Sequence, residues 1–204
     1  MNIHIQHGRI IDPANHIDSQ QDVFIVEGKI ASIGSAPEGF KADKIINATD
    51  LIICPGLVDL SARLREPGDE YKATLISELQ AAVAGGITSL ACQPDTDPVL
   101  DEPGLVEMLK YRAKQQGLAN VYPLGAITRQ LQGKNLSEMS ALQSAGCVGF
   151  SQANAAITDT QVLWRAMEYA ATFGYTLFLH AEEPYLAQGG VAHDGEVATR
   201  LGLK

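Results

Sequence analysis

The sequence has few of the features that mark nucleic-acid-binding, membrane or secreted proteins. Its 204 residues include 15 lysine and arginine residues against 24 aspartate and glutamate residues, so the formal net charge is −9. A surface of that sign repels phosphate groups, and no basic patch interleaved with aromatic residues offsets it, so neither a nucleic acid nor an anionic membrane is expected as a partner. Apolar runs fall well short of the ~18 residues that cross a bilayer. The N-terminal stretch MNIHIQHGRI also lacks the apolar core of a signal peptide.

Cysteine is scarce as well. The three cysteines, Cys54, Cys92 and Cys147, lie far apart and form no Cys-x-x-Cys pair. Each has apolar neighbours in the sequence, so we expect reduced thiols in the core. A cytoplasmic location fits these absences.

The residues that are present follow two successive patterns. Residues 1–54 contain strand-like runs rich in isoleucine and valine, separated by turn-forming residues, with a hairpin turn at 27–29. This part predicts a small β domain, a β-sandwich unit. Residues 55–204 alternate strand-like with helix-like segments, which is typical of a parallel sheet in an α/β fold.

The second part is expected to contain five strands, over 57–63, 87–92, 120–126, 147–151 and 175–180. The helices between them are expected over 69–86, 102–117, 136–146 and 158–174. Helical spacing predicts one apolar face formed by Leu75, Leu79, Ala82 and Val83, and core positions for Trp164 and Met167. A closed (β/α)8 barrel needs eight strands in about 250 residues, so we expect the front portion of such a barrel, a truncated one.

The polar residues at the strand ends are the candidates for function, because parallel α/β folds place their chemistry there. In chain order these residues are Ser61, Arg63 and Arg65, then Gln93, Asp95 and Thr96, then Thr128 and Arg129, then Ser151, Gln152 and Asn154, and last His180, Glu182 and Glu183. The first group lies in PGLVDLSARLREPG, residues 55–68, and combines two arginines with a serine and a glutamate. That combination matches no metal-site or nucleophile pattern.

Several segments resemble one enzyme family. PGLVDLSARLREPGDEYKATLISELQAAVAGGITSLACQPDTDPVLD is similar to the start of the barrel in dihydroorotases, zinc enzymes of the amidohydrolase superfamily, and GFSQANAAITD, LFLHAEE and GEVATRLGL resemble later segments. REPG followed by EYK separates dihydroorotases from hydantoinases and allantoinases. The resemblance covers essentially the whole chain. It implies a (β/α)8 TIM-barrel amidohydrolase fold, of which this chain would contain the first five strands.

The chain departs from the family at the positions of the metal ligands. The His-x-His motif that ends the first barrel strand falls on Ser61 and Arg63, and the aspartate pair of the fourth strand falls on Gln152 and Ala153. A serine hydroxyl is a poor zinc ligand, and a protonated arginine has no lone pair to donate. Of the metal ligands that this chain could hold, His180 is the only surviving candidate, and the remaining family ligands, a sixth-strand histidine and an eighth-strand aspartate, would lie beyond residue 204.

The resemblance also assigns a substrate-binding pair, of which part is retained. Arg65 matches the arginine that binds the substrate carboxylate, a task that suits a guanidinium. Asp95 stands where the family has a substrate-binding asparagine, and its charge would repel a carboxylate unless Arg63 or Arg65 pairs with it. We therefore expect an ion-pair network in which Arg63 fills the space of the metal.

The resemblance with these departures implies a non-catalytic pseudo-dihydroorotase of pyrimidine biosynthesis. No cofactor is expected, and the family role would be that of a structural partner of aspartate carbamoyltransferase, in a homodimer or a hetero-oligomer. One alternative is an active zinc enzyme interconverting carbamoyl aspartate and dihydroorotate, with its site completed by residues outside this chain. Another is a sensor that binds one of these compounds through Arg65 without turning it over.

Overall fold

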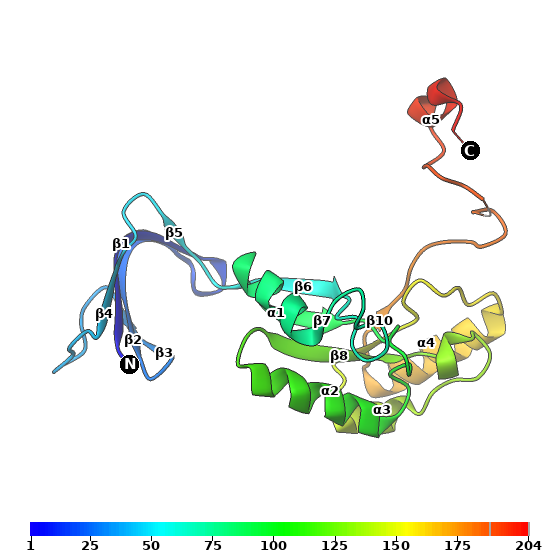
Figure 1. Cartoon of the computed structure of the whole chain (residues 1–204), viewed down its shortest axis with the longest axis horizontal. Helices are drawn as coiled ribbons and strands as arrows, with labels where there is room; N and C mark the ends of the chain where they lie inside the picture. Colours follow the sequence, from blue (N-terminus) through cyan, green and yellow to red (C-terminus); the bar gives the residue numbers. More distant parts are fainter. Residues whose placement is uncertain (188, 204) are drawn as a thin grey trace. The chain divides into compact units, whose positions relative to one another are not determined.

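The computed structural model describes residues 1–187 and 189–203. It divides into two compact units, Met1–Gly56 and Leu57–Lys204 (Figure 1). None of the helices in the described ranges is long and apolar enough to cross a membrane.

The first unit is one mixed sheet with the strand order β3-β2-β1-β4, in which β5 also pairs with β1. Its strands are β1 (Ile3–Asp12), β2 (Ile17–Val26), β3 (Lys29–Ile33), β4 (Lys44–Asn47) and β5 (Ile52–Ile53), and a short 3-10 helix, Pro13–Asn15, joins β1 to β2. The sequence predicts a sandwich here. The structure differs in that β4 and β5 both pair with β1, so all five strands of the first unit belong to one sheet.

The β1–β2 pair contains an irregularity that is fixed by Asp22. The register shifts between Ile5 and Gly8, and His7 has a φ of 63° there. Asp22 Oδ1 accepts a hydrogen bond of 3.0 Å from the His7 backbone N–H, and Asp22 Oδ2 lies 2.8 Å from His4 Nε2. The backbone donor, followed by the histidine, lowers the pKa of Asp22 below its ordinary value.

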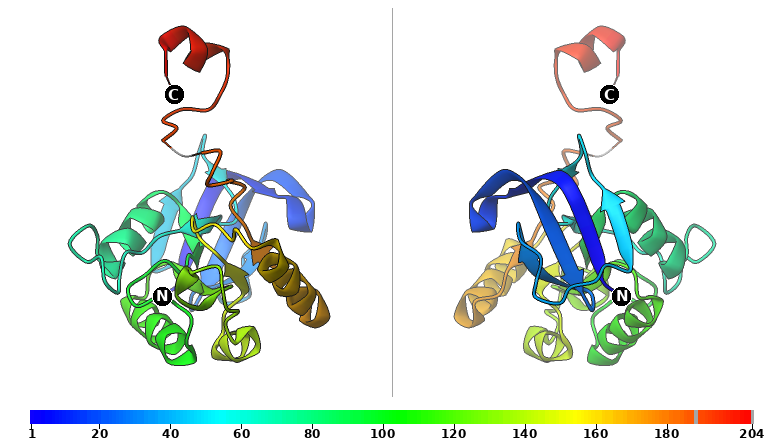
Figure 2. Two further views of the ribbon diagram at one scale, coloured as in Figure 1. Left: turned by 90° about the vertical axis from the view of Figure 1, so that its right-hand side faces the viewer. Right: turned by 90° about the vertical axis from the view of Figure 1, so that its left-hand side faces the viewer.

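The second unit is a parallel sheet with the order β10-β9-β8-β7-β6. Its strands are β6 (Leu57–Ala62), β7 (Ile87–Cys92), β8 (Asn120–Ala126), β9 (Gly149–Ser151) and β10 (Leu177–Phe178). Its helices are α1 (Leu75–Ala84), α2 (Pro103–Gln116), α3 (Met139–Ala145), α4 (Thr160–Phe173) and α5 (Glu196–Leu201), with a 3-10 turn at Arg129–Leu131. Helices α1 to α4 follow the strands in alternation and form an arc along one side of the sheet (Figure 2).

Helix α1 begins later than its sequence pattern predicts. Thr74 caps it through a reciprocal capping box with Ser77. The preceding residues form turns instead, in which the Asp69 N–H donates to the Arg65 carbonyl and the Lys72 N–H donates to the Asp69 carbonyl. Leu75 and Leu79 are buried between the helices and the sheet together with Leu64, Leu90 and other members of one core cluster. A second cluster around Leu142 and Phe150 lies beneath α3 and α4.

Some predicted core residues lie at the surface. Val83 is 46% exposed, Trp164 58% and Met167 51%. Helix α4 buries the small Ala166 and Ala170 against the rest of the unit, whereas Trp164, Met167 and Phe173 face outward. Cys54 is exposed too, because it follows the short strand β5 in the connection between the two units, whereas Cys92 and Cys147 are buried as expected.

Candidate functional site

The C-terminal ends of the parallel strands surround a cavity of about 250 Å³. Residues of the first, second, fourth and fifth barrel strands or of the loops after them line it, namely Leu60, Ser61, Arg63, Gln93, Ser151, Ala153, Asn154, Phe178, Leu179 and His180. The structure therefore brings together three of the four positions where the family pattern expects metal ligands, Ser61, Arg63 and Ala153, with His180 at the same cavity.

Arg63 connects two other loops at the edge of this cavity. Its Nε donates to Asp95 Oδ2 at 2.7 Å, and its Nη2 donates to Asn154 Oδ1 at 2.9 Å. Both members of the Arg63–Asp95 ion pair are about one-quarter exposed, at 26% and 27%, so water screens the pair only in part. The guanidinium thus joins the loops that follow β7 and β9.

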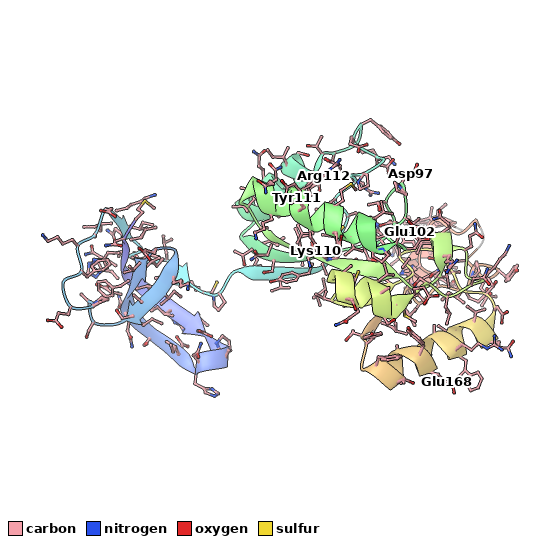
Figure 3. The ribbon with its side chains drawn as sticks, turned by 90° about the horizontal axis from the view of Figure 1, so that it is seen from below. Asp97, Glu102, Lys110, Tyr111, Arg112 and Glu168 are labelled. Atoms are coloured by element: carbon pink, nitrogen blue, oxygen red, sulfur yellow. The ribbon has the colours of Figure 1, made fainter. Side chains whose placement is uncertain are left out.

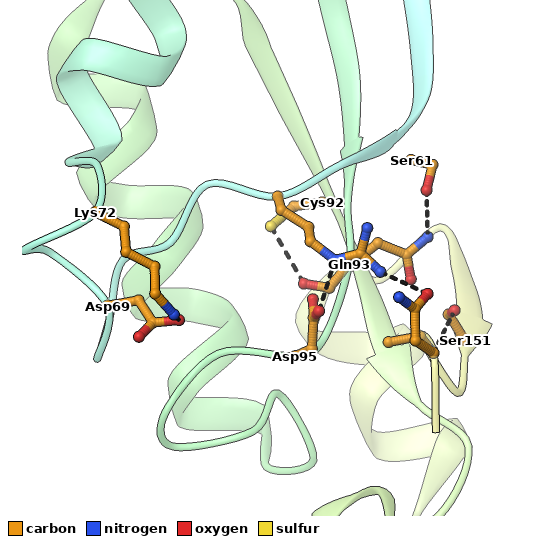
Figure 4. A network of polar contacts seen from close by, with 10 residues as sticks. Ser61, Asp69, Lys72, Cys92, Gln93, Asp95 and Ser151 are labelled. Atoms are coloured by element: carbon orange, nitrogen blue, oxygen red, sulfur yellow. Dashed lines mark hydrogen bonds and ion pairs between the residues drawn. The ribbon is translucent and has the colours of Figure 1, made fainter. Parts of the chain in front are cut away.

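Gln93 joins the ends of β7 and β6. Its Nε2 donates to Ser61 Oγ at 3.1 Å, and the two side chains face each other in Figure 4. Gln93 is only 6% exposed. Its Oε1 has no hydrogen-bond partner among the residues that the structure describes.

Gln152 and Ala153 occupy the positions of the family's aspartate pair. Gln152 is 2% exposed, and its carboxamide contacts the Thr128 hydroxyl, with Nε2 at 2.8 Å and Oε1 at 3.0 Å. Thr128 Oγ1 also accepts from the Gly133 backbone N–H at 2.9 Å. Gln152 is therefore part of a buried loop anchor and does not line the 250 Å³ cavity. Ala153 does line the cavity, and its backbone N–H donates to Ser151 Oγ.

His180 lies at the margin of the cavity with Glu182. Its Nε2 is 2.8 Å from Glu182 Oε2, and both side chains are about half exposed. Within residues 1–187 and 189–203, no group of three or more His, Cys, Asp or Glu side chains is placed to hold a metal ion. A hydroxyl, a guanidinium and a methyl group beside one histidine do not form a zinc-ligand set, and the positive charge of Arg63 opposes a cation.

Arg65 is placed apart from this cavity. It has a φ of 62°, and its side chain takes part in no hydrogen bond or ion pair with the described residues. The two partners that its sequence suggests are engaged elsewhere, since Asp95 pairs with Arg63 and Glu66 Oε1 pairs with Arg112 Nη1 at 3.2 Å. Arg112 lies on α2 (Figure 3).

Four polar residues of the strand ends have no role assigned from the sequence, but in the structure three of them line the cavity and the fourth, Thr128, anchors the neighbouring loop through Gln152. They are Gln93, Thr128, Ser151 and Asn154. Their location at strand ends was the available signal. Gln93, Asn154 and Thr128 each have a side-chain partner 24 or more residues away, so spacing alone does not identify them.

Comparison with known proteins identifies the family. Residues 50–204 match the family model described as Dihydro-orotase-like. The chain is 48% identical over 203 residues to a dihydroorotase-like protein of Pseudomonas aeruginosa, covering 100% of this chain and 48% of that protein. It is 42% identical over 204 residues to a dihydroorotase of Geotalea daltonii, again covering 100% of this chain and 48% of the relative. The chain thus spans about half the length of the curated relatives it matches.

Solved structures support the same fold. An L-hydantoinase (dihydropyrimidinase) from Arthrobacter aurescens superposes with a TM-score of 0.75 at 21% identity, over 91% of this chain and 42% of that one. A D-hydantoinase gives a TM-score of 0.63 at 22% identity, over 89% of this chain and 40% of that one. The second unit is therefore a partial TIM barrel of the amidohydrolase type, preceded by a separate sheet. With its match to the family model over residues 50–204, this chain belongs to the dihydroorotase-like family of the amidohydrolase superfamily.

Proposed function

We propose that the chain is part of a non-catalytic dihydroorotase-like protein, which serves pyrimidine biosynthesis as a structural partner of aspartate carbamoyltransferase. The observation that carries the first half of the proposal is the Arg63–Asp95 ion pair at 2.7 Å. It puts a cationic side chain, held in place by a carboxylate, at the position where the family pattern has a histidine ligand.

The chemistry of the reaction explains why this substitution matters. Opening or closing a cyclic amide at neutral pH requires a metal-activated hydroxide, because the pKa of water falls from ~15.7 to ~7 only on a metal ion. Arg63 cannot contribute a lone pair, and Gln152 is a neutral amide already engaged with Thr128. The described residues therefore supply one imidazole, His180, where a stable zinc site needs three or four ligands.

The structural role is supported by the retained frame. The two apolar clusters of the barrel unit are well buried although the ligand positions have changed. A protein that retains the buried apolar core of the family but lacks its metal ligands fits a role in which the surface binds a partner protein. The partner itself, aspartate carbamoyltransferase, comes from the family resemblance, and an oligomer with it or with further copies follows from the same proposal.

The first test is the zinc content of the untagged full-length protein, measured by elemental analysis together with its activity on dihydroorotate and carbamoyl aspartate. We expect zinc well below one equivalent per chain and no turnover in either direction. The dihydroorotase of Geotalea daltonii, assayed in parallel, is the positive control. An equivalent of zinc that survives dialysis, with metal-dependent turnover, would instead establish the active zinc enzyme whose site is completed outside this chain.

The second test addresses the partner. Full-length protein is mixed with aspartate carbamoyltransferase from the same organism and examined by sedimentation velocity. We expect a common, faster boundary whose stoichiometry is constant across concentrations. Separate boundaries at micromolar concentrations of both proteins would refute the scaffold role and leave the question of catalysis untouched.

Arg65 supports a second candidate function, that of a sensor. Its guanidinium is not committed to a carboxylate of the described residues, and this suits bidentate binding of a substrate-like carboxylate. Calorimetry with carbamoyl aspartate and with dihydroorotate, on the parent protein and on Arg65→Gln, tests it. Heat that is lost in the variant would support the sensor, and no heat with either compound would exclude it.

A further inference from the structure

A second cavity, of about 380 Å³, lies at the opposite end of the parallel sheet from the strand-end site. It is lined by the last turns of α2, by the turn that follows this helix, and by the first residues of β8. Its volume falls within the range of about 300–1,000 Å³ that small-molecule sites occupy. Helix α2 packs against α1 and α3 of the same unit, so the walls of this cavity are formed by described residues of one unit.

The charge of this α2–β8 cavity is opposite to that of the chain. Lys110 and Lys114 line it, and neither forms an ion pair with the residues that the structure describes. The sequence has no aspartate or glutamate between Glu107 and Glu138, and none of the described residues that line the cavity is acidic. A local excess of positive charge attracts a small anion, whereas a chain of net charge −9 repels a long polyanion such as a nucleic acid.

The ammonium group of Lys110 is held in place on α2 (Figure 3). Its Nζ donates to the Ala145 carbonyl, at the end of α3, at 3.2 Å. It lies against Gly146, whose φ is 110°, in the space that a side chain at that position would take. An ammonium group with one such hydrogen bond keeps two N–H donors for a ligand. The C-terminal ends of α2 and α3 each carry about −0.5 of a charge, so about +1 remains at the cavity beside the two lysines.

The remaining lining of the α2–β8 cavity is largely aromatic and aliphatic. Tyr111 and Tyr122 line it and are 66% and 44% exposed, and Leu118 and Val121 add aliphatic surface. Tyrosine rings stack with flat rings of a ligand, and their hydroxyls donate or accept hydrogen bonds. The ligand that matches this lining combines an anionic group with a flat ring.

We propose that the α2–β8 cavity binds a nucleoside monophosphate, with the phosphate at Lys110 and Lys114 and the base against Tyr111 and Tyr122. Lysine ammonium groups bind phosphate as point charges. Stacking on aromatic side chains tolerates different bases, so both a purine and a pyrimidine fit. Because the charge excess is small and the cavity is open, we expect dissociation constants of about 0.1–1 mM. The site requires neither a metal ion nor aspartate carbamoyltransferase, so its test is independent of the proposed function.

The test is equilibrium dialysis of the full-length protein against radiolabelled uridine monophosphate and adenosine monophosphate, at neutral pH and constant ionic strength. We expect saturable binding of both compounds. Uridine, which lacks the phosphate, and inorganic phosphate, which lacks the ring, are added as competitors. Each should compete at least ten-fold more weakly than the unlabelled monophosphate. Arg65→Gln should bind the monophosphates as the parent does, which separates this cavity from the carboxylate site of the sensor.

Four variants assign the binding to the cavity. Lys110→Gln and Lys114→Gln should each weaken binding of the monophosphates about five-fold or more. Tyr122→Leu removes a ring and should weaken the monophosphates while leaving competition by inorganic phosphate unchanged. Lys134→Gln is the matched control, because Lys134 is an exposed lysine of the same acid-free segment that does not line the cavity, and it should change nothing.

Three results would overturn the proposal. The first is the absence of saturable binding of either monophosphate up to about ten millimolar. The second is competition by uridine or by inorganic phosphate as strong as that of the monophosphate, since one half of the ligand would then suffice. The third is an equal loss of affinity in Lys134→Gln and in the two cavity lysine variants, which would mean unspecific attraction by charge. The first two comparisons use the unmodified protein, so they decide the question even if a variant does not fold.

Discussion

Arg63 makes hydrogen bonds to two residues that are distant in the sequence, Asp95 after β7 and Asn154 after β9. Its guanidinium links the ends of β6, β7 and β9, as a shared metal ion would, through hydrogen bonds and an ion pair. A partly buried ion pair is not by itself strongly stabilising, because desolvation offsets much of its attraction. Removing one partner is costly, since the other charge then remains without compensation.

The substitution Arg63→Met tests this linkage. We expect the free energy of unfolding to fall by about 1–3 kcal/mol, because Asp95 and Asn154 lose their donor. Urea unfolding followed by far-UV circular dichroism measures the change. In the double variant with Asp95→Asn, part of the loss should be recovered. If the two single losses simply add, Arg63 and Asp95 are not coupled.

The three cysteines differ in environment. Burial raises the pKa of Cys92 to about 12, and burial likewise raises the pKa of Cys147 to about 12, so both stay protonated at neutral pH. Cys54 is exposed. The thiolate is the reactive form, so the folded chain should present one reactive thiol.

Alkylation with iodoacetamide at neutral pH, analysed by peptide mass spectrometry, checks this expectation. We predict rapid modification of Cys54 and modification of Cys92 and Cys147 only after denaturation. Cys54→Ser should abolish rapid labelling of the folded chain. Equally fast labelling of Cys92 would mean that the first core cluster opens readily.

At the scale of elements, Glu66 ties the loop after β6 to two helices. Its Oε2 accepts from the Leu75 backbone N–H at 2.8 Å, at the start of α1, and its Oε1 pairs with Arg112 of α2. The first contact satisfies one of the N–H groups that a helix leaves free at its N-terminus, and the negative charge favours that end of the helix dipole.

Replacing Glu66 with alanine should therefore lower the free energy of unfolding by about 1–2 kcal/mol. Glu66→Gln keeps an acceptor for Leu75 and should lose less than the alanine variant. Glu107→Ala, an exposed position on α2, is the matched control. Urea unfolding compares the three variants, and an alanine variant as stable as the control would contradict the role of Glu66.

Asp22 makes the β1–β2 pair sensitive to acid. Its pKa is lowered in the folded state, mainly by the His7 backbone N–H, so the folded chain binds this proton less readily than the unfolded chain. The contribution to stability is thus complete above the usual aspartate pKa of ~3.9 and is lost as the pH falls through the lower, folded value. Asp22→Asn should be less stable near neutral pH and show a weaker loss on acidification. Thermal unfolding from neutral pH downward measures both, and parallel curves for the two proteins would refute the assignment.

The elements of the second unit were predictable because their signals are local. Strands alternate with amphipathic helices, and all five strands and four predicted helices occur near their expected positions. The start of α1 was missed because Thr74 and Ser77 form a capping box in a stretch whose composition also suits a helix. The polar residues of the site could be predicted because they lie at strand ends. The hydrogen bonds between Thr128 and Gln152 and between Gln93 and Ser61 could not, because they depend on how loops distant in the sequence meet in space.

At the scale of the whole molecule, apolar side chains remain uncovered on the open sheet and on the last long helix. Leu57, Val58 and Leu60 of β6 are exposed, as are Trp164 and Met167 of α4. Helical periodicity predicts core positions for Trp164 and Met167, and this prediction is wrong for the described residues, because periodicity does not reveal what covers an apolar face. The chain spans about half the length of the curated relatives it matches.

Trp164 allows a direct measurement of this exposed face, because it is the only tryptophan of the chain. Large exposed apolar patches promote association, so the 204-residue chain should self-associate as its concentration rises. Its tryptophan emission should be red-shifted in dilute solution and move to shorter wavelength on association. Trp164→Gln should reduce the association seen by sedimentation velocity, whereas Tyr111→Gln, at an exposed tyrosine of α2, should not. If both variants associate as the parent does and the emission never shifts, the α4 face takes no part, and the exposed residues of β6 become the surface to test.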